Sequence, residues 1–377
     1  MNTETMSLNS AQEFVTQLFG RAGITVNGRA AHDIKVHNSK FYHRILAHSS
    51  LGLGESYMEG WWDCEDLSQF FFLLLRSRID ELVNPATLAL QALRSKVLTL
   101  GKSDPYKIGE FHYDIDEDLY RAMLDKRMIY TCGYWKDALS LDEAQENKLQ
   151  LICDKIYLEP GMRVLDIGCG WGGFLKYAAE KYGIKGVGVT VSKEQAEVAK
   201  QNCKGLDIEI LLEDYREMSG KYDRIVSIGM FEHVCKKNYH TFFDVAADCL
   251  EDNGMFLLHT IGNSQSAGGG TDPWIEKYIF PNSMIPSISQ VATAIEDFFV
   301  MEDWHNFGPD YDKTLLSWFE NFDRNWPQLQ NGFDKVFYRK WKYYLLSCAG
   351  SFRARRTQLW QIVLTKRGLV NGYQSIR

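Results

Sequence analysis

The sequence contains no long apolar run and no recognisable leader. Its most conspicuous apolar stretch, Phe70 to Leu75, is far shorter than the roughly 20 residues that a membrane-spanning helix needs. The N-terminal residues, MNTETMSLNSAQEF, include neither a basic region nor an apolar core of the kind that a secretory signal has. We therefore expect no membrane-spanning segment, so that any contact with a membrane is peripheral.

Positive charge and paired cysteines are also scarce. Lys and Arg number 42 against 49 Asp and Glu, which gives a net charge of −7 and argues against a general nucleic-acid binder. The eight cysteines include no C-x-x-C pair, and their spacing fits no zinc site. An even number of cysteines does not by itself indicate a disulfide framework in a chain of 377 residues. We predict a reduced, cytoplasmic protein without a metal site.

Length and composition indicate a folded protein of two domains. Hydrophobic residues make up 45% of the 377 residues and charged residues 24%, as is usual for globular proteins. Leucines recur at helical spacing between Leu82 and Leu98, and GKSDP at 101–105 then interrupts the pattern. We place a domain boundary there, between a small, mainly helical N-terminal domain over 1–104 and a second domain over 105–377.

From Met162 onward, apolar runs that end in glycine alternate with helical stretches. We expect strands at MRVLDIG, GVGVTV, IEILLED, DRIVSIGM and GMFLLHTIG, and helices at FLKYAAEKYG and KEQAEVAKQNCKG. This alternation predicts an α/β fold, in which a parallel sheet carries helices on both faces. We also predict an edge strand at 359–368 and a mainly helical insertion at 273–344.

The sharpest local signal is VLDIGCGWGGF at 164–174. Its glycines permit positive φ angles and a close approach of a ligand to the backbone, at the end of a strand where such sheets bind ligands. A dinucleotide site is one alternative, since GCGWGG resembles G-x-G-x-x-G, and a purely structural turn is another. However, Thr190 stands where a ribose-binding acid is usual. Asp166 directly precedes the glycines, and D-x-G-C-G-W-G resembles motif I of class I methyltransferases that use S-adenosylmethionine.

Further motifs narrow the resemblance. Together with DIGCGWG, the stretches YTCGYW at 130–135, TVSKEQ at 190–195 and IGMFEHV at 228–234 resemble the cyclopropane-fatty-acyl-phospholipid synthases. The resemblance extends over nearly the whole chain through LGLGESYMEGWW at 51–62, FHYD at 111–114, MEDWHNFGPDY at 301–311 and CAGSFRARRTQLWQ at 348–361. The related mycolic acid cyclopropane synthases resemble only the part from roughly Tyr106 onward, so the N-terminal domain favours the phospholipid enzyme.

The resemblance implies a class I methyltransferase fold with S-adenosylmethionine as cofactor. Asp166 would lie near the methionine part of the cofactor, Asp214 would reach the adenine amine, and Tyr215 would flank the ring. Thr131 replaces a serine that is common in the family and keeps its hydroxyl. The full implied set is Tyr130, Thr131, Asp166, Gly168, Gly170, Trp171, Thr190, Ser192, Gln195, Asp214 and Tyr215.

The same resemblance implies the reaction and its catalytic residues. In this family, the cis double bond of an unsaturated phospholipid acyl chain attacks the sulfonium methyl, a proton leaves, and a cyclopropane ring closes. A bound bicarbonate ion accepts the proton. The residues implied around the ion are Cys132, Glu232, His259, Ile261 through its backbone N–H, and Tyr311. His259 and Tyr311 can donate hydrogen bonds, whereas an ionised Glu232 can only accept them.

The resemblance also implies the partners and location: a phospholipid bilayer, a homodimer and the inner face of the cytoplasmic membrane. The basic clusters at 339–342 and 353–356 would then meet anionic lipid, or else form a solvated face. The run from Phe70 to Leu75 is either a lipid-handling or dimerising surface or part of the core. Three other functions stay open: a methyltransferase that does not close the ring, a non-catalytic lipid-binding protein, and a nicotinamide oxidoreductase.

Overall fold

The computed structural model describes residues 7–79, 117–266 and 271–377, which form two compact units. The first unit combines Met1–Leu100 with Gly270–Pro281 and Tyr311–Thr357, and the second combines Gly101–Gly269, Asn282–Asp310 and Gln358–Arg377. The predicted second domain is thus distributed over both units. The boundary predicted at 104/105 and the leucine pattern from Leu82 to Leu98 lie outside the described residues.

The second unit contains a seven-stranded sheet in the order β5-β4-β3-β6-β7-β9-β8. The four pairings among β5, β4, β3, β6 and β7 are parallel, and β8 pairs antiparallel with β9. This confirms the predicted α/β fold. The strands are β3 (Arg163–Ile167), β4 (Lys185–Thr190), β5 (Ile208–Leu212), β6 (Tyr222–Ile228), β7 (Leu250–Asn263), β8 (Val300–Asn306) and β9 (Thr357–Thr365).

Two parts of the sheet differ from the prediction. The segment predicted as an edge strand, β9, lies between β7 and β8, and almost all of its residues are buried, as expected for a strand covered on both faces. The edge strand at this end of the sheet is β8, which the sequence analysis placed inside the helical insertion. Its first residues, Val300 and Met301, are exposed, so β8 does not show the apolar pattern by which the inner strands are recognised.

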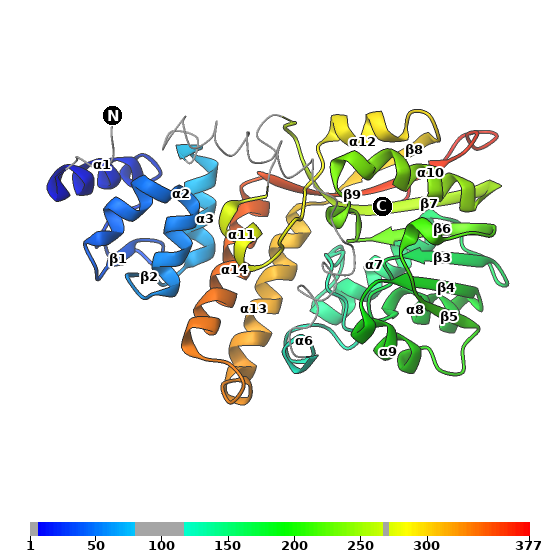
Figure 1. Cartoon of the computed structure of the whole chain (residues 1–377), viewed down its shortest axis with the longest axis horizontal. Helices are drawn as coiled ribbons and strands as arrows, with labels where there is room; N and C mark the ends of the chain where they lie inside the picture. The colour runs from blue at the N-terminus through cyan, green and yellow to red at the C-terminus, as the bar shows by residue number, and fades with distance from the viewer. Residues whose placement is uncertain (1–6, 80–116, 267–270) are drawn as a thin grey trace. The chain divides into compact units, whose positions relative to one another are not determined.

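Helices cover both faces of this sheet (Figure 1). Successive strand residues point to opposite faces, so Val164 packs with α7, α8 and α9, while Leu165 packs with α10 and α12. These helices are α7 (Leu141–Lys155), α8 (Gly173–Tyr182), α9 (Lys193–Asn202), α10 (Tyr239–Cys249) and α12 (Ile288–Ile295). The same unit also holds α6 (Glu117–Met123) and the short helices η3 (Tyr215–Glu217), η4 (Phe231–His233) and η5 (Lys236–Asn238).

The first unit is mainly helical, with one small antiparallel pair, β1–β2. On α14, a Cβ at Gly350 would lie 2.6 Å from Cβ of Phe71 and 2.7 Å from the carbonyl oxygen of Ser68, so α14 packs very closely on α3. Its elements are α1 (Leu8–Arg21), β1 (Ile34–Val36), α2 (Lys40–Met58), β2 (Trp62–Cys64), α3 (Leu67–Arg76), α11 (Pro273–Tyr278), α13 (Pro309–Leu329) and α14 (Lys335–Arg353).

The apolar run at 70–75 and the basic cluster at 339–342, both considered as membrane contacts in the sequence analysis, form contacts within this unit. Phe70, Phe71 and Leu74 of the apolar run are buried in its core. Arg339 donates to the carbonyl oxygen of Trp62 at 2.9 Å and forms an ion pair with Asp63, so one charge of the 339–342 cluster is neutralised by the chain itself. Among the described residues, no helix is long and apolar enough to span a bilayer.

Candidate active site

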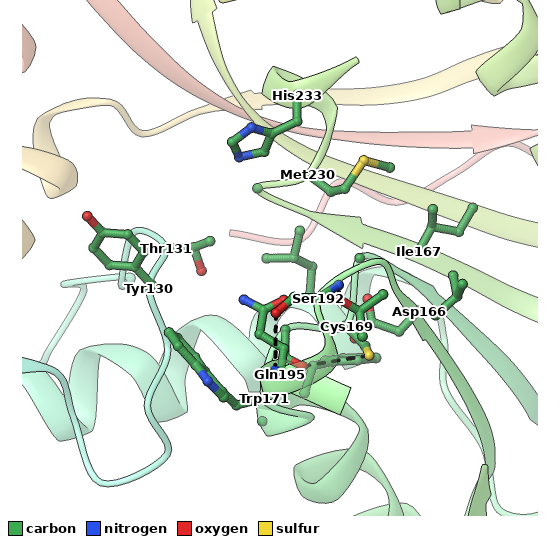
Figure 2. Close-up of a pocket in the computed structure, with 18 of the residues that line it drawn as sticks. Tyr130, Thr131, Asp166, Ile167, Cys169, Trp171, Ser192, Gln195, Met230 and His233 are labelled. Carbon is green, nitrogen blue, oxygen red and sulfur yellow. Dashed lines mark hydrogen bonds between the residues drawn. The ribbon is translucent and has the colours of Figure 1, made fainter. Parts of the chain in front are cut away.

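A cavity of about 190 Å³ lies at the carboxyl ends of the parallel strands in the second unit (Figure 2). All eleven residues predicted to bind the cofactor line it. They come from the segment before α7, from β3 and β4 with the turns that follow them, from the start of α9, and from the segment after β5. The lining set includes Tyr130, Thr131, Asp166, Gly168, Gly170, Trp171, Thr190, Ser192, Gln195, Asp214 and Tyr215.

The turn after β3 has a backbone that only glycine adopts easily. Gly168 has a φ of +86°, and a Cβ at this position would lie 2.5 Å from Cβ of Met230. Gly170 and Gly172 also have positive φ angles, of 53° and 80°, and α8 begins at the next residue, Gly173. The chain therefore turns sharply from strand to helix and leaves its backbone open toward the cavity.

The turn after β4 contains neutral, hydrogen-bonded side chains at the place where a dinucleotide site usually has an acidic residue. Thr190 Oγ1 donates to Gln195 Oε1 at 3.0 Å, and the backbone N–H of Ser192 donates to the same hydroxyl oxygen at 3.2 Å. Ser192 in turn caps α9 by accepting from the backbone N–H of Gln195. All three side chains are buried, so this turn presents no carboxylate to a ribose, unlike a dinucleotide site.

The loop after β5 presents Asp214 and Tyr215. Arg216 donates to Asp214 through Nε at 2.8 Å and through Nη2 at 2.6 Å. Burial acts to raise the pKa of Asp214, but these bonds outweigh it and hold the pKa below the ordinary value. Asp214 is therefore an ionised acceptor at neutral pH. The ring of Tyr215 packs against Phe242 with centroids 5.4 Å apart, which fixes its position at the cavity wall.

Asp166 faces a buried lysine that the sequence analysis missed. Asp166 is 2% exposed, its Oδ1 has no hydrogen-bond partner, and burial raises its pKa to about 7 against the opposing charge of Lys148. Lys148 on α7 also lines the cavity and donates to Thr131 Oγ1 at 2.9 Å. Burial lowers its pKa to about 8. The partnerless oxygen and the open glycine turn fit a ligand that carries both donors and a negative group, as the amino-acid part of S-adenosylmethionine does.

A signal for Lys148 was present in the sequence. Leu141, Gln145, Lys148, Ile152 and Lys155 follow one another at spacings of four and three, and all five are buried on one side of α7. Three polar residues within such a stripe are unusual, because a buried amine or amide needs a partner. Gln145 finds one in the carbonyl oxygen of Thr131, at 2.8 Å.

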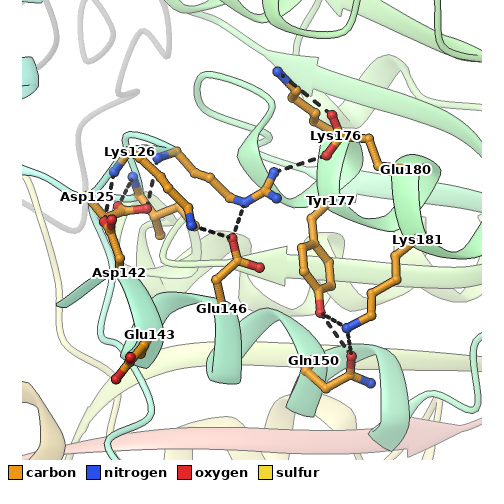
Figure 3. Close-up of polar contacts among 12 residues, drawn as sticks. Asp125, Lys126, Asp142, Glu143, Glu146, Gln150, Lys176, Tyr177, Glu180 and Lys181 are labelled. Carbon is orange, nitrogen blue, oxygen red and sulfur yellow. Dashed lines mark hydrogen bonds and ion pairs between the residues drawn. The ribbon is translucent and has the colours of Figure 1, made fainter. Parts of the chain in front are cut away.

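The segment that carries Tyr130 and Thr131 is anchored by a network of polar contacts (Figure 3). Asp125 accepts from the backbone N–H of Ile129 at 2.8 Å, which closes a turn just before the two site residues. Arg127 reaches Glu146 on α7 at 2.7 Å and Glu180 on α8 at 3.3 Å. The segment is thereby tied to both helices that flank the cavity, which restricts the positions of Tyr130 and Thr131.

Two of the five predicted catalytic residues, Glu232 and Ile261, are hydrogen-bonded to each other, and a third, His259, lies on β7 two residues before Ile261. The backbone N–H of Ile261 donates to Glu232 Oε1 at 2.6 Å, while Glu232 Oε2 is buried without a hydrogen-bond partner. Burial raises the pKa of Glu232 to about 7, although the Ile261 N–H acts in the opposite direction. The backbone N–H of Ile261, which was predicted to hold an anion, thus orients the carboxylate of Glu232 in this structure. Glu232 contacts β7 two residues beyond His259.

His259 is a neutral imidazole enclosed by the sheet. It is 1% exposed, its Nδ1 lies 3.3 Å from Nε2 of Gln361, and its own Nε2 has no hydrogen-bond partner. Burial, and then the nearby charges of Lys148 and Lys155, hold its pKa well below the ordinary value. The imidazole therefore stays uncharged at neutral pH and offers one unused ring nitrogen.

The other two predicted catalytic residues are Cys132 and Tyr311. Cys132 is fully buried beside Thr131, and its thiol donates to the carbonyl oxygen of Gly133 at 3.1 Å. Tyr311 belongs to the first unit, where its ring packs on Phe352 with centroids 4.5 Å apart, and its approach to the other four stays a prediction. Among the described residues, none of the five lines the cavity itself, whereas Met230 and His233 from the loop after β6 do.

Comparisons with known proteins identify the family of this chain. The family model described as "Mycolic acid cyclopropane synthetase" matches residues 102–362. The chain is 50% identical over 363 residues to the cyclopropane-fatty-acyl-phospholipid synthase of Escherichia coli K12, which covers 96% of this chain and 94% of that one. It is 32% identical over 350 residues to the tuberculostearic acid methyltransferase UfaA1 of Mycobacterium tuberculosis, covering 86% and 81%. The solved mycolic acid cyclopropane synthase CmaA1, complexed with SAH and CTAB, has a TM-score of 0.64 and 32% identity, covering 70% and 99%.

Proposed function

The chain belongs to the mycolic acid cyclopropane synthetase family of S-adenosylmethionine-dependent methyltransferases, and on this premise we propose that it is a cyclopropane fatty acid synthase. It would transfer a methylene from S-adenosylmethionine to the cis double bond of an unsaturated acyl chain in a membrane phospholipid. One structural observation carries the proposal. Glu232 Oε2 and His259 Nε2 are both buried without a protein partner, close to a cavity lined by the whole predicted cofactor set.

We place the cofactor in this cavity. When bound, S-adenosylmethionine supplies a sulfonium methyl group that an electron-rich carbon can attack. Asp166 Oδ1 is available to accept from an amine, and the ionised Asp214 from the adenine amino group. Trp171 and Tyr215 supply aromatic surface at the wall. The residues present therefore fit the amine and the adenine ring of the group.

The chain must also position a poor nucleophile and keep water away from it. An alkene reacts only when its two carbons are held in line with the methyl group, so orientation supplies a large part of the rate enhancement. Water at the site would trap the cationic species as an alcohol. Cys132, His259 and Glu232 are all at most 8% exposed, which supports a site closed to bulk water.

A proton acceptor is the remaining requirement, and we propose a bicarbonate ion held by the predicted catalytic residues. His259 can donate to the ion from a neutral imidazole, and Glu232 can accept from the ion's hydroxyl group. Cys132 would shape the site, and Tyr311 would supply a second donor. With its pKa raised to about 7, Glu232 can also take up the proton for a short time near neutral pH.

The proposed substrate determines the location and partners. We propose peripheral association with the inner face of the cytoplasmic membrane, with the N-terminal domain serving lipid handling and homodimerisation. The activity named for the E. coli relative, which aligns over 96% of this chain, supports a phospholipid substrate. Arg355 is exposed and available to an anionic surface, whereas Arg353 is paired with Asp312.

The test is incubation of the protein with unsaturated phospholipid vesicles and S-adenosylmethionine that carries a trideuterated methyl group. Mass spectrometry of the lipid should show a product with two of the three deuteriums, because ring closure requires loss of one hydron from the transferred methyl. NMR should show a ring rather than an exomethylene group. A product with all three deuteriums would instead identify a fatty-acyl methyltransferase that leaves the ring open.

A further inference from the structure

Gln361 is a buried polar residue for which the proposed mechanism has no role so far. It lies on β9, next to β7 in the sheet, and its side chain is fully buried. Its Nε2 is 3.3 Å from Nδ1 of His259, and its Oε1 has no hydrogen-bond partner. Burying an amide inside a sheet costs free energy unless the amide forms hydrogen bonds. The contact of Gln361 with His259 offsets part of this cost.

The contact determines which ring nitrogen of His259 carries the proton. A neutral imidazole has one N–H and one acceptor nitrogen. In the amide orientation of the structure, the nitrogen of Gln361 can only donate, so His259 Nδ1 accepts from it and the proton lies on Nε2. Burial, and then the charges of Lys148 and Lys155, oppose a second proton on the ring. The nitrogen without a protein partner is therefore a donor.

The opposite orientation of the amide would leave the site with two acceptors. If Gln361 accepted from Nδ1–H, His259 Nε2 would become a lone-pair acceptor alongside Glu232 Oε2, which is also without a partner. Hydrogen carbonate has one hydroxyl and could satisfy only one of them. With an Nε2–H donor and a carboxylate acceptor, the site instead matches an anion that both accepts and donates.

We propose that Gln361 is a positioning residue that fixes His259 as the Nε2–H tautomer. The role of this tautomer in binding hydrogen carbonate rests on the proposed function, whereas the tautomer itself does not. The site would prefer a small planar oxyanion with a hydroxyl group over one without. Only the former can accept a hydrogen bond from His259 and also donate one to Glu232.

The tautomer can be measured directly. Two-bond proton–nitrogen correlation NMR on protein with 15N-labelled histidine separates the two neutral forms, and His259→Ala identifies the signal. Gln361→Glu keeps the shape but can only accept once ionised, so it should move the proton to Nδ1. Gln361→Met has a similar size and no polar group, so it should give a mixture. Gln358→Glu is the matched control on the same strand, where Gln358 accepts from Asn306 and Trp360.

We expect Nε2–H in the wild type and in Gln358→Glu, and Nδ1–H in Gln361→Glu. Turnover on vesicles should fall at least about tenfold in Gln361→Glu with an unchanged Kd for S-adenosylmethionine, since a wrong imidazole tautomer costs ~10⁴-fold in the serine protease triad. Nδ1–H in the wild type, or a tautomer unaffected by either Gln361 variant, would overturn the inference. A tautomer that switches while turnover stays at the wild-type level would instead overturn the proton-acceptor site in the proposed function.

Discussion

Glu232→Gln should make the folded protein more stable at alkaline pH. Burial raises the pKa of the carboxyl from 4.5 to about 7. Between these two values the unfolded chain has released the proton while the folded chain still holds it, so the stability of the wild type falls as the pH rises. At about 1.4 kcal/mol per pH unit, the full loss above pH 7 is roughly 3 kcal/mol.

Glutamine removes this titration and keeps an oxygen that can accept from the N–H of Ile261. Roughly 2 kcal/mol of the loss falls between pH 5.5 and pH 8, which is an accessible range. Urea unfolding of both proteins should therefore show an advantage for Glu232→Gln that grows by about this amount from pH 5.5 to pH 8. Glu251→Gln is a matched control, since Glu251 is an exposed carboxylate on β7.

A constant difference between the two proteins across this range would refute the argument, because it would mean that Glu232 is ionised in the folded protein at pH 5.5. The same variant should also lose turnover while keeping its affinity for S-adenosylmethionine. Greater stability combined with lost turnover would indicate that the buried carboxylate is retained for chemistry rather than for folding.

Three further changes test other parts of the structure. Lys148→Met removes the donor to Thr131 and should weaken S-adenosylmethionine binding by roughly tenfold in calorimetry, as expected for a hydrogen bond from a charged group; unchanged affinity would show that Lys148 does not shape the cofactor site. Gly168→Ala places a Cβ 2.5 Å from Met230 at a positive φ and should abolish cofactor binding in the same assay. Gly350→Ala brings α14 into collision with α3 and should cost roughly 1–3 kcal/mol in urea unfolding, while the affinity for S-adenosylmethionine is retained.

Local sequence was sufficient to predict the residues of the cavity. Each of the eleven lies in a short motif, most of them directly after a strand, and the carboxyl ends of neighbouring parallel strands meet at one edge. Gly168, Gly170 and Gly172 indicate a tight turn, because each has a positive φ angle that other residues rarely adopt. Such signals depend only on residues close in sequence, so they can be interpreted without knowing the fold.

Contacts between distant segments could not be predicted in the same way. Nothing near Gln361 in sequence shows that its amide meets a histidine on β7, and the sequence alone does not show that the N–H of Ile261 is already used by Glu232. The position of β8 at the sheet edge was missed because its exposed residues do not form an apolar strand pattern. These features depend on tertiary neighbours, which local patterns do not specify.

The packing of α3 on α14 has a consequence for the order in which the protein folds. The two helices are separated by more than 250 residues of chain, and the unit that they form is completed only by residues 311–357. During synthesis, the part of α3 that packs on α14 has no partner until α14 has left the ribosome, whereas most strands of the sheet have already been made. This part of α3 therefore stays exposed for almost the entire time of translation, and a fragment that ends before α14 should be a substrate for chaperones.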